Sequence, residues 1–201
     1  MGLWELEERL RQQGFSHIAG TDEAGAGPLA GRVYAAAVIL PFGLELPYLN
    51  DSKQVTPRRR EVLFDQIKER AVAWSVAWVE PEEIDQIDIL NSRIKAMERA
   101  AEGLSPAADY LLVDGNRDHG SYCAIQMPHE TVVKGDSRSA SIAAASILAK
   151  VSRDRYMEEM AARYPQYEFQ RHKGYPTKLH YERLRQYGPC PIHRRSFLKK
   201  L

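Results

Sequence analysis

Four carboxylates occur where an expected strand ends or an expected helix begins. Asp22 and Glu23 precede a glycine-rich turn, Asp114 ends a short apolar run, and Asp136 precedes a long helical pattern. Such positions lie on the rim of an open α/β sheet, where binding sites gather. Converging carboxylates repel one another unless cations lie between them, and hard oxygen ligands suit Mg²⁺ or Mn²⁺. Two such ions activate a water and stabilise the leaving oxygen in phosphoryl transfer, so the pattern indicates a candidate acidic metal site.

Each of these carboxylates also has a structural alternative. Asp114 with Gly115 is an ordinary turn dipeptide, and Asp136 could be the N-cap of the helix that follows it. Neighbours in a regular strand point to opposite faces, which separates Asp22 from Glu23. Both reach one site only if the strand has ended or bulged, and the glycines of the turn that follows would make a bulge easy.

The turn Gly25-Ala26-Gly27-Pro28 does not have the pattern of a nucleotide-binding loop. It lacks the third glycine of GxGxxG, and GxxxxGK[ST] occurs nowhere in the chain, which excludes a P-loop NTPase. With no bulky side chains, the backbone N–H and C=O groups of the turn could approach a sugar-phosphate backbone. The alternative is a tight turn with no ligand.

Charge is divided unevenly along the chain, although the formal net charge is only +1. Residues 1–147 carry 15 Lys and Arg against 22 Asp and Glu, whereas residues 148–201 carry 13 against 5. Aromatic residues are interspersed in this basic third: Tyr164, Tyr167, Phe169, Tyr175, Tyr181, Tyr187 and Phe197. Positive charge with flat rings is typical of a surface that binds nucleic acid; the alternative is a solvated face whose tyrosines pack on the core.

The composition is that of one soluble globular domain. The chain has 201 residues, of which 44% are hydrophobic and 27% charged, so disorder, collagen and a disulfide scaffold are excluded. No apolar run approaches the ~20 residues of a membrane-spanning helix. The charged start, 1–13, is no signal peptide, and Cys123 and Cys190 form no CxxC pair. We therefore expect a cytoplasmic protein with no membrane partner and, because coiled-coil heptads are absent, a monomer.

Hydrophobic periodicity predicts a mixed α/β sheet with helices on its faces. Strands are expected over 17–21, 32–40, 72–79 and 109–113, with a hairpin-like pair around 121–126 and 130–134. Helices are expected over 3–13, 56–70, 81–102 with a break near Asp88, 137–164 and 177–187. The small residues that open the helix 137–164 predict close packing on the sheet. We expect one domain over 1–201, with a core of about 15–163 and a basic helical segment of about 164–201.

Several motifs, in order and over about residues 18–181, resemble those of the bacterial ribonuclease HII family. They are GTDEAGAGPLAG at 20–31, AAAVIL at 35–40, DSK at 51–53, LVDG at 112–115, KGDS at 134–137, AASILAKV at 144–151 with Arg153 and Asp154, and HKGYPT at 172–177 with His180. The resemblance implies a ribonuclease H-like fold: a mixed five-stranded sheet flanked by helices, with a C-terminal helical segment that helps to hold substrate.

The resemblance also implies an activity and a set of site residues. The family cuts the RNA strand of RNA–DNA hybrids and incises duplex DNA 5′ of a single ribonucleotide, leaving 3′-hydroxyl and 5′-phosphate ends. The implied ligands of two Mn²⁺ or Mg²⁺ ions are Asp22, Glu23, Asp114 and Asp136. Tyr175 would pack on the nucleotide after the ribonucleotide. The backbone of Gly25, Ala26 and Gly27 would read the 2′-hydroxyl, which distinguishes RNA from DNA.

The chain departs from the family at the middle of this turn. The family's turn usually reads Gly-Arg-Gly, and here Ala26 takes the place of the arginine. Backbone contacts survive the change, whereas a phosphate or sugar contact made by the arginine is lost. Arg32, where the family often has Pro, could partly compensate. We therefore retain the activity and expect less efficient cleavage at single ribonucleotides.

The expected mechanism is in-line attack by a metal-activated water, with no His or Lys as general base. His172, His180 and His193 are then phosphate neighbours or structural. Asp154 is expected to be an ion-pair partner. Phosphate contacts are assigned to Lys53, for which a solvated side chain is the alternative, and to Lys173, with Arg171 and Lys178 beside it.

Two other functions fit the same residues. A ribonuclease H-like DNA nuclease or resolvase would share the acidic site and be indifferent to the 2′-hydroxyl. A nucleic-acid-binding protein that has lost catalysis would share the basic segment, but the presence of all four carboxylates argues against it. The expected partner is an RNA–DNA hybrid or a ribonucleotide-containing DNA duplex.

Overall fold

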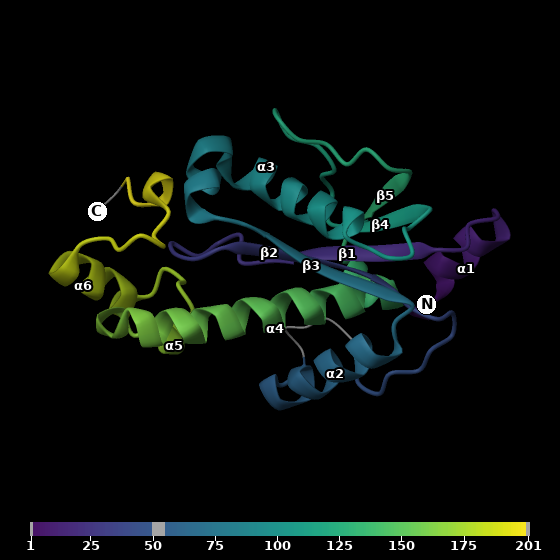
Figure 1. The fold of residues 1–201 in the computed structure, drawn as a ribbon, viewed down its shortest axis with the longest axis horizontal. Coiled ribbons are helices and arrows are strands. Elements are labelled where there is room, and N and C mark those ends of the chain that lie inside the picture. Colours follow the sequence, from purple (N-terminus) through teal and green to yellow (C-terminus); the bar gives the residue numbers. More distant parts are fainter. Residues whose placement is uncertain (1, 50–54, 200–201) are drawn as a thin grey trace.

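The computed structural model describes residues 2–49 and 55–199, which form a five-stranded mixed sheet with helices on both faces (Figure 1). The strand order is β3-β2-β1-β4-β5, with β1 antiparallel to β2 and parallel to β4. β2 and β3 are antiparallel, and β4 and β5 are parallel. The strands are β1 (Ile18–Ala24), β2 (Val33–Ile39), β3 (Ala73–Val79), β4 (Tyr110–Asp114) and β5 (His129–Val132).

Two helical layers cover the sheet. Helix α3 (Pro81–Glu102) lies on one face, and α4 (Ala140–Arg163) and α2 (Pro57–Arg70) lie on the other (Figure 1). Strand β2 is buried along its whole length because alternate side chains enter two cores. Ala35 and Ala37 pack in the core on the α3 side, whereas Ala36 and Val38 pack in the core on the α4 side. This double burial explains an uninterrupted apolar run where a half-exposed strand would alternate.

Local signals set the ends of the main helices. Thr56 caps α2 by accepting a hydrogen bond from the Arg59 N–H, and Pro57 occupies the first helical position. The predicted break in α3 is confirmed at Asp88, which has a φ of 67°. The Asp88 carboxylate accepts hydrogen bonds from the N–H and the side-chain amide of Asn91, so it acts as a cap for the second half of the helix.

The small residues of α4 allow the helix to approach the sheet closely, as predicted. A Cβ placed on Gly20 of β1 would lie only 2.2 Å from the backbone nitrogen of Ile142. Glycine is therefore required where the two backbones meet. This contact fixes α4 beneath the end of β1, which carries the first two carboxylates.

The structure corrects three predictions: the end of one strand, a hairpin and the start of one helix. β1 continues through Ala24 rather than ending at Thr21, because it pairs with β2 in regular register as far as Tyr34. The predicted hairpin is wrong: residues 121–126 form no strand beyond an isolated bridge, and β5 pairs in parallel with β4 instead. Helix α4 begins at Ala140, because residues Gly135–Ser137 form a separate 3₁₀ turn, η1.

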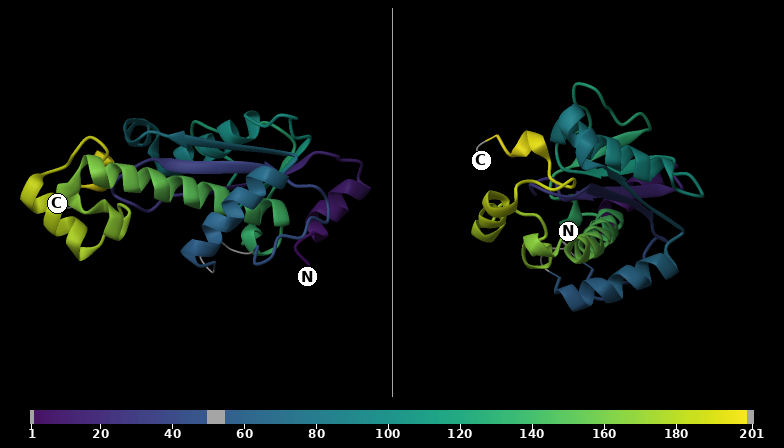
Figure 2. Two further views of the ribbon diagram at one scale, coloured as in Figure 1. Left: turned by 60° about the horizontal axis from the view of Figure 1, so that its bottom comes forward. Right: turned by 60° about the vertical axis from the view of Figure 1, so that its left-hand side comes forward.

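The basic C-terminal segment forms short elements around the far end of α4 (Figure 2). They are η2 (Pro165–Tyr167), α5 (Phe169–His172), α6 (Lys178–Tyr187) and η3 (Arg195–Phe197). After α6 the chain returns to the sheet, where His193 forms a bridge with Ala30.

At the other end of the chain, α1 (Glu5–Gln12) precedes the first strand of the sheet. Across residues 2–49 and 55–199, no helix is both long and apolar enough to cross a membrane.

Candidate active site

A pocket of about 320 Å³ opens where β1 runs past the end of β4. It brings together three of the four predicted carboxylates, the glycine-rich turn and the predicted stacking ring. Its walls are Asp22, Glu23, Ala24, Gly25, Ala26, Gly27, Asp114, Ser146, Lys150 and Tyr175. Acidic groups, exposed backbone and an aromatic ring therefore share one cavity.

The two adjacent carboxylates reach this pocket from opposite faces of an unbroken strand. Asp22 is paired with Ala36, which faces α4, and Ser146 of α4 is hydrogen-bonded to its carboxylate. Glu23 is paired with Ala35 on the α3 side, and its Oε1 lies 2.6 Å from Nε of Arg93 in α3. The expectation that the strand must end or bulge is therefore wrong.

The reason is that the sheet is open on one side at this point. Pairing between β1 and β4 stops at Thr21 with Val113, so the last three residues of β1 have no neighbour on that edge. Side chains from both faces of β1 can bend around the free edge into the same cavity. The sheet topology brings the two carboxylates together here, without any irregularity of the strand.

Asp114 ends β4 and faces the same cavity. Its Oδ1 accepts a hydrogen bond of 2.7 Å from the Gly135 N–H, which ties η1 to the end of the strand. A Cβ at Gly135 would lie 2.5 Å from Cδ1 of Ile142 and 3.0 Å from this carboxylate oxygen. Glycine is therefore needed for the turn to approach Asp114.

Asp136 occupies η1, one residue after the amide that binds Asp114, and it is not among the residues that line the pocket. The alternative in which Asp136 caps the long helix is wrong. Ser139 is the N-cap, and its hydroxyl accepts a hydrogen bond from the Ile142 N–H. Asp136 thus lies beside the acidic site without entering it.

Two of the pocket carboxylates, Asp22 and Glu23, are destabilised as anions. Burial raises the pKa of Asp22 well above its usual range, and repulsion from Glu23 and Asp114 raises it further. Burial also raises the pKa of Glu23, although Arg93 opposes the shift. Within the described part of the chain, Glu23 Oε2 is buried with no hydrogen-bond partner. Buried, mutually repelling carboxylate oxygens are the donor set that a hard divalent cation would neutralise.

The side chains as they stand are not arranged as a finished metal centre. Over residues 2–49 and 55–199, no group of three or more His, Cys, Asp and Glu side chains has the geometry to hold an ion. Glu23 is engaged by Arg93, and Asp22 Oδ1 accepts a 2.7 Å hydrogen bond from the Glu23 N–H. The chemistry and burial of the donors fit a divalent cation, and small side-chain rotations would have to bring the oxygens to it.

Two buried arginines that the sequence reasoning did not identify shape the glycine-rich turn. Arg194 is fully buried and donates hydrogen bonds of 2.7–3.0 Å to the carbonyls of Gly25, Ala26, Pro28 and Gly31. One guanidinium therefore fixes the course of the whole turn. In the sequence, Arg194 is marked only by its place beside Arg195 in the basic C-terminal segment.

Arg153 lies on the inner side of the same turn. A Cβ on Gly25, whose φ is +95°, would lie 2.0 Å from Nε of Arg153, so only glycine fits. Arg153 also donates to the carbonyl of Lys173 at 2.9 Å, and its guanidinium lies 5.6 Å from the ring centroid of Tyr175. It connects the turn with the loop that carries the pocket's aromatic ring. The sequence analysis placed Arg153 in a family motif beside Asp154 and gave it no role at the turn.

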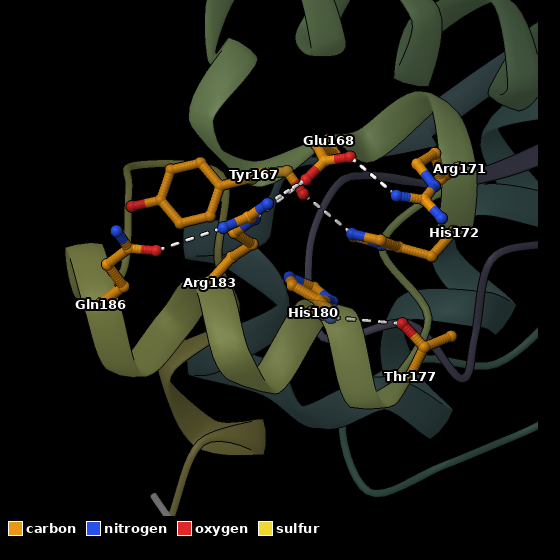
Figure 3. Close-up of polar contacts among 8 residues, drawn as sticks. All are labelled: Tyr167, Glu168, Arg171, His172, Thr177, His180, Arg183 and Gln186. Atoms are coloured by element: carbon orange, nitrogen blue, oxygen red, sulfur yellow. Dashed lines mark hydrogen bonds and ion pairs between the residues drawn. The ribbon is translucent and has the colours of Figure 1, made fainter.

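Three histidines of the C-terminal segment are structural rather than phosphate-binding. His172 and His180 stack with ring centroids 4.4 Å apart, and Figure 3 shows His172 directed toward the Tyr167 carbonyl. Burial lowers the pKa of His172, and it lowers those of His180 and His193 to about 4. All three rings are therefore neutral at pH 7.

The neutral rings form a chain with a single consistent set of tautomers. Nδ1 of His180 donates to the carbonyl of Tyr175 at 3.0 Å, so its Nε2 carries no hydrogen. Nε2 of His193, 3.0 Å from that atom, must then be the donor, and its Nδ1 accepts the Cys190 N–H at 2.9 Å. The chain ends on the backbone of Tyr175, whose side chain is 42% exposed at the pocket.

Three of the predicted basic contacts, Lys173, Arg171 and Lys178, are not among the residues that line the pocket. Lys173 forms an ion pair with Glu158, and Arg171 forms one of 3.0 Å with Glu168, which also binds Arg183 (Figure 3). Lys178 is exposed on α6. Lys53 lies outside the described residues. Asp154 is an ion-pair partner, as predicted, and its partner is Lys150, 2.6 Å away.

Comparison with known proteins agrees with this architecture. Residues 19–200 match the family model described as Ribonuclease HII. A protein of Endomicrobium trichonymphae named Ribonuclease HII is 52% identical over 196 residues, covering 97% of this chain and 91% of that protein. The crystal structure of the ribonuclease H2 from Pyrococcus horikoshii OT3 superposes with a TM-score of 0.74 and 27% identity, covering 90% of this chain and 93% of that chain.

A more distant structure shares the fold alone. Bst-RNase HIII in complex with Mn²⁺ superposes with a TM-score of 0.63 and 18% identity, covering 89% of this chain and 65% of that chain. The predicted ribonuclease H-like fold, a mixed five-stranded sheet flanked by helices, is confirmed.

Proposed function

The chain belongs to the ribonuclease HII family of metal-dependent endoribonucleases H, and on that premise we propose that it cuts the RNA strand of RNA–DNA hybrids and incises duplex DNA 5′ of embedded ribonucleotides. The products would carry 3′-hydroxyl and 5′-phosphate ends. The observation that carries the proposal is one pocket in which three carboxylates, a glycine-rich backbone turn and an aromatic ring meet. We further propose that the enzyme acts as a monomer in the cytoplasm.

Asp22, Glu23 and Asp114 would hold the divalent cations, and Asp136 would join them from η1. The raised pKa values of Asp22 and Glu23 and the unpartnered Glu23 oxygen support this assignment, since a cation would offset both the burial of these charges and their mutual repulsion. Two Mn²⁺ or Mg²⁺ ions would supply water activation and stabilisation of the leaving 3′ oxygen. The Mn²⁺ complex of Bst-RNase HIII supports a metal of this class.

The chain's own residues would select and align the substrate. The turn at Gly25, Ala26 and Gly27 would read the 2′-hydroxyl through its backbone, which Arg194 and Arg153 keep rigid. Tyr175 would stack on the nucleotide after the ribonucleotide, held by the histidine chain behind it. A rigid turn and a positioned ring favour in-line attack because they limit the motion of the sugar and phosphate at the cut site.

The test uses three labelled duplexes: all DNA, DNA with one ribonucleotide, and an RNA–DNA hybrid, each with Mg²⁺, Mn²⁺ or EDTA. We expect metal-dependent cutting 5′ of the ribonucleotide and within the hybrid, with the all-DNA duplex intact. Equal cutting of the all-DNA duplex would instead identify a DNA nuclease or resolvase. Binding without cutting would identify a nucleic-acid-binding protein.

Two variants sharpen this test. Asp114→Asn should lose more than about 100-fold of the activity while the protein still binds the duplex, since a lost ligand costs more than a lost supporting contact. Asp65→Asn, an exposed change on α2, is the matched control. If the hybrid is cut and the duplex with one ribonucleotide is not, we assign the lost activity to the turn that contains Ala26. The variant Ala26→Arg should then restore cutting at the single ribonucleotide.

A further inference from the structure

One cation lines the acidic pocket. Among the described residues that form its walls, Lys150 is the only one with a positive charge. It lies on α4 one turn after Ser146, which also lines the pocket, so both project from the same face of the helix. A nucleic-acid strand that enters the pocket would therefore meet this ammonium group beside the carboxylates.

The ammonium group of Lys150 is not used to neutralise the pocket carboxylates. Its Nζ binds Asp154 Oδ1 at 2.6 Å, one further turn along α4. An ammonium group has three hydrogens, and the contact with Asp154 uses one of them. The side chain is 23% exposed, so it lies at the wall of the cavity rather than in bulk solvent.

The surroundings of Lys150 favour an anion. Burial lowers the pKa of Lys150, the hydrogen bond to Asp154 and the charge of that carboxylate oppose this shift, and the positive charges of Arg153 and Arg60 add to it. The pocket is thus acidic at the ends of β1 and β4 and basic along α4. The carboxylates attract divalent cations but repel a phosphodiester. The lysine on α4 attracts the phosphodiester, so the two kinds of charge together suit a phosphodiester substrate.

We propose that Lys150 is a substrate-contacting residue whose ammonium group binds a backbone phosphate of the strand in the pocket, and that Asp154 is the positioning residue that holds it at the pocket wall. The proposal rests on the proposed function, since it assigns the phosphate contact of the same site. Lys150 would then supply a positive charge in the pocket, where Ala26 of the turn takes the place of the family's usual arginine.

The test separates charge from packing with two substitutions. Lys150→Met keeps the apolar stem and removes the charge, whereas Lys150→Arg keeps the charge. Lys95→Met is the matched control, because Lys95 also forms a 2.6 Å ion pair, with Glu83, but on α3 at the opposite face of the sheet. Binding to the single-ribonucleotide duplex is measured by fluorescence anisotropy in EDTA over a range of salt concentrations, and cleavage is measured in Mn²⁺.

We expect Lys150→Met to lower kcat/KM about tenfold or more, since a contact to a charged group is lost. The slope of log K against log salt should fall by about 0.9, the value for one lost phosphate contact. Lys150→Arg should keep the parent slope, and Lys95→Met should behave as the parent does. An unchanged slope and kcat/KM in Lys150→Met would overturn the proposal. Equal losses in the Met and Arg variants would assign Lys150 to packing instead.

Asp154→Asn tests the positioning role and remains informative if Lys150→Met fails to fold. We expect a higher KM with a smaller loss than in Lys150→Met, and no additional loss in the double variant, because the two residues act as one unit. Parent-like KM in Asp154→Asn would refute the positioning role. Failure of the parent enzyme to cut any ribonucleotide-containing duplex would refute the proposed function itself, while the salt slope in EDTA would still report on the phosphate contact.

Discussion

At the scale of single residues, the burial of neighbouring carboxylates in the pocket destabilises the native state. Asp22 and Glu23 are buried next to each other and near Asp114, and the pKa values of both are raised as a result. Burial of like charges destabilises the native state unless a cation or a proton neutralises them. On the proposed function, the same burial that destabilises the metal-free protein would favour the binding of cations.

This conflict predicts that Asp22→Asn stabilises the metal-free enzyme. Removal of the buried charge should raise the free energy of unfolding in EDTA at pH 7.5 above that of the parent, because the ionised carboxylate is buried beside two other acidic groups in the native state and solvated in the unfolded chain. The same variant should be inactive with Mg²⁺ or Mn²⁺. Chemical denaturation of both proteins measures the change, and a variant less stable than the parent in EDTA would contradict it.

At the scale of elements, the C-terminal segment contributes to the candidate site although it lies far away in sequence. Arg194 crosses from this segment to the turn after β1 and satisfies four backbone carbonyls there. The histidine chain of the same segment supports Tyr175. The turn and the ring, which both line the pocket, are thus positioned by residues beyond Pro165.

We expect Arg194→Met to cost about 2–4 kcal/mol of stability, because buried carbonyls lose their donors. Arg195→Met, on the neighbouring exposed residue, is the control. Thermal unfolding measures the loss. A variant as stable as the parent would show that water replaces the guanidinium without cost.

The histidine chain predicts a pH dependence of stability. The native pKa of His180 and of His193 is lowered to about 4 from an ordinary value of 6.5. The unfolded chain therefore binds protons that the native state rejects, so the stability that these rings contribute is present above pH 6.5 and is lost as pH falls toward 4. His193→Gln should flatten the curve of unfolding free energy against pH over this range. A curve as steep as that of the parent would contradict this assignment.

At the scale of the whole molecule, opposite charges occupy different regions. The basic residues are concentrated after residue 148, in α4 and the segment around its far end, and the acidic pocket lies at the ends of β1 and β4. A duplex bound across α4 would meet positive charge away from the carboxylates. Long-range attraction would thus guide the substrate while divalent cations neutralise the cleavage site.

This arrangement predicts a strong salt dependence of duplex binding. The double variant Lys173→Gln, Lys178→Gln should lower the slope of log K against log salt by roughly two, with kcat unchanged. Lys95→Gln on α3 should leave the slope as it is. A parent-like slope in the double variant would show that these lysines lie outside the duplex interface.

The sequence alone determined the local features of this protein. The Thr56 cap, the break at Asp88 and the small-residue face of α4 follow from short-range chemistry, and the structure confirms them. The family motifs predicted the fold, which is confirmed, and four acidic residues, of which Asp22, Glu23 and Asp114 line one pocket. These signals are readable because each depends on neighbours within a turn or two of the chain.

Only the tertiary structure decided how distant residues combine. Asp22 and Glu23 share a pocket because β4 ends beside an unbroken β1, and β5 joins the sheet in parallel rather than as a hairpin. Arg194, Arg153 and Lys150 acquire their roles from segments brought beside them by packing. No local pattern encodes such contacts, because buried charges are positioned by the carbonyls and carboxylates that surround them in the folded chain.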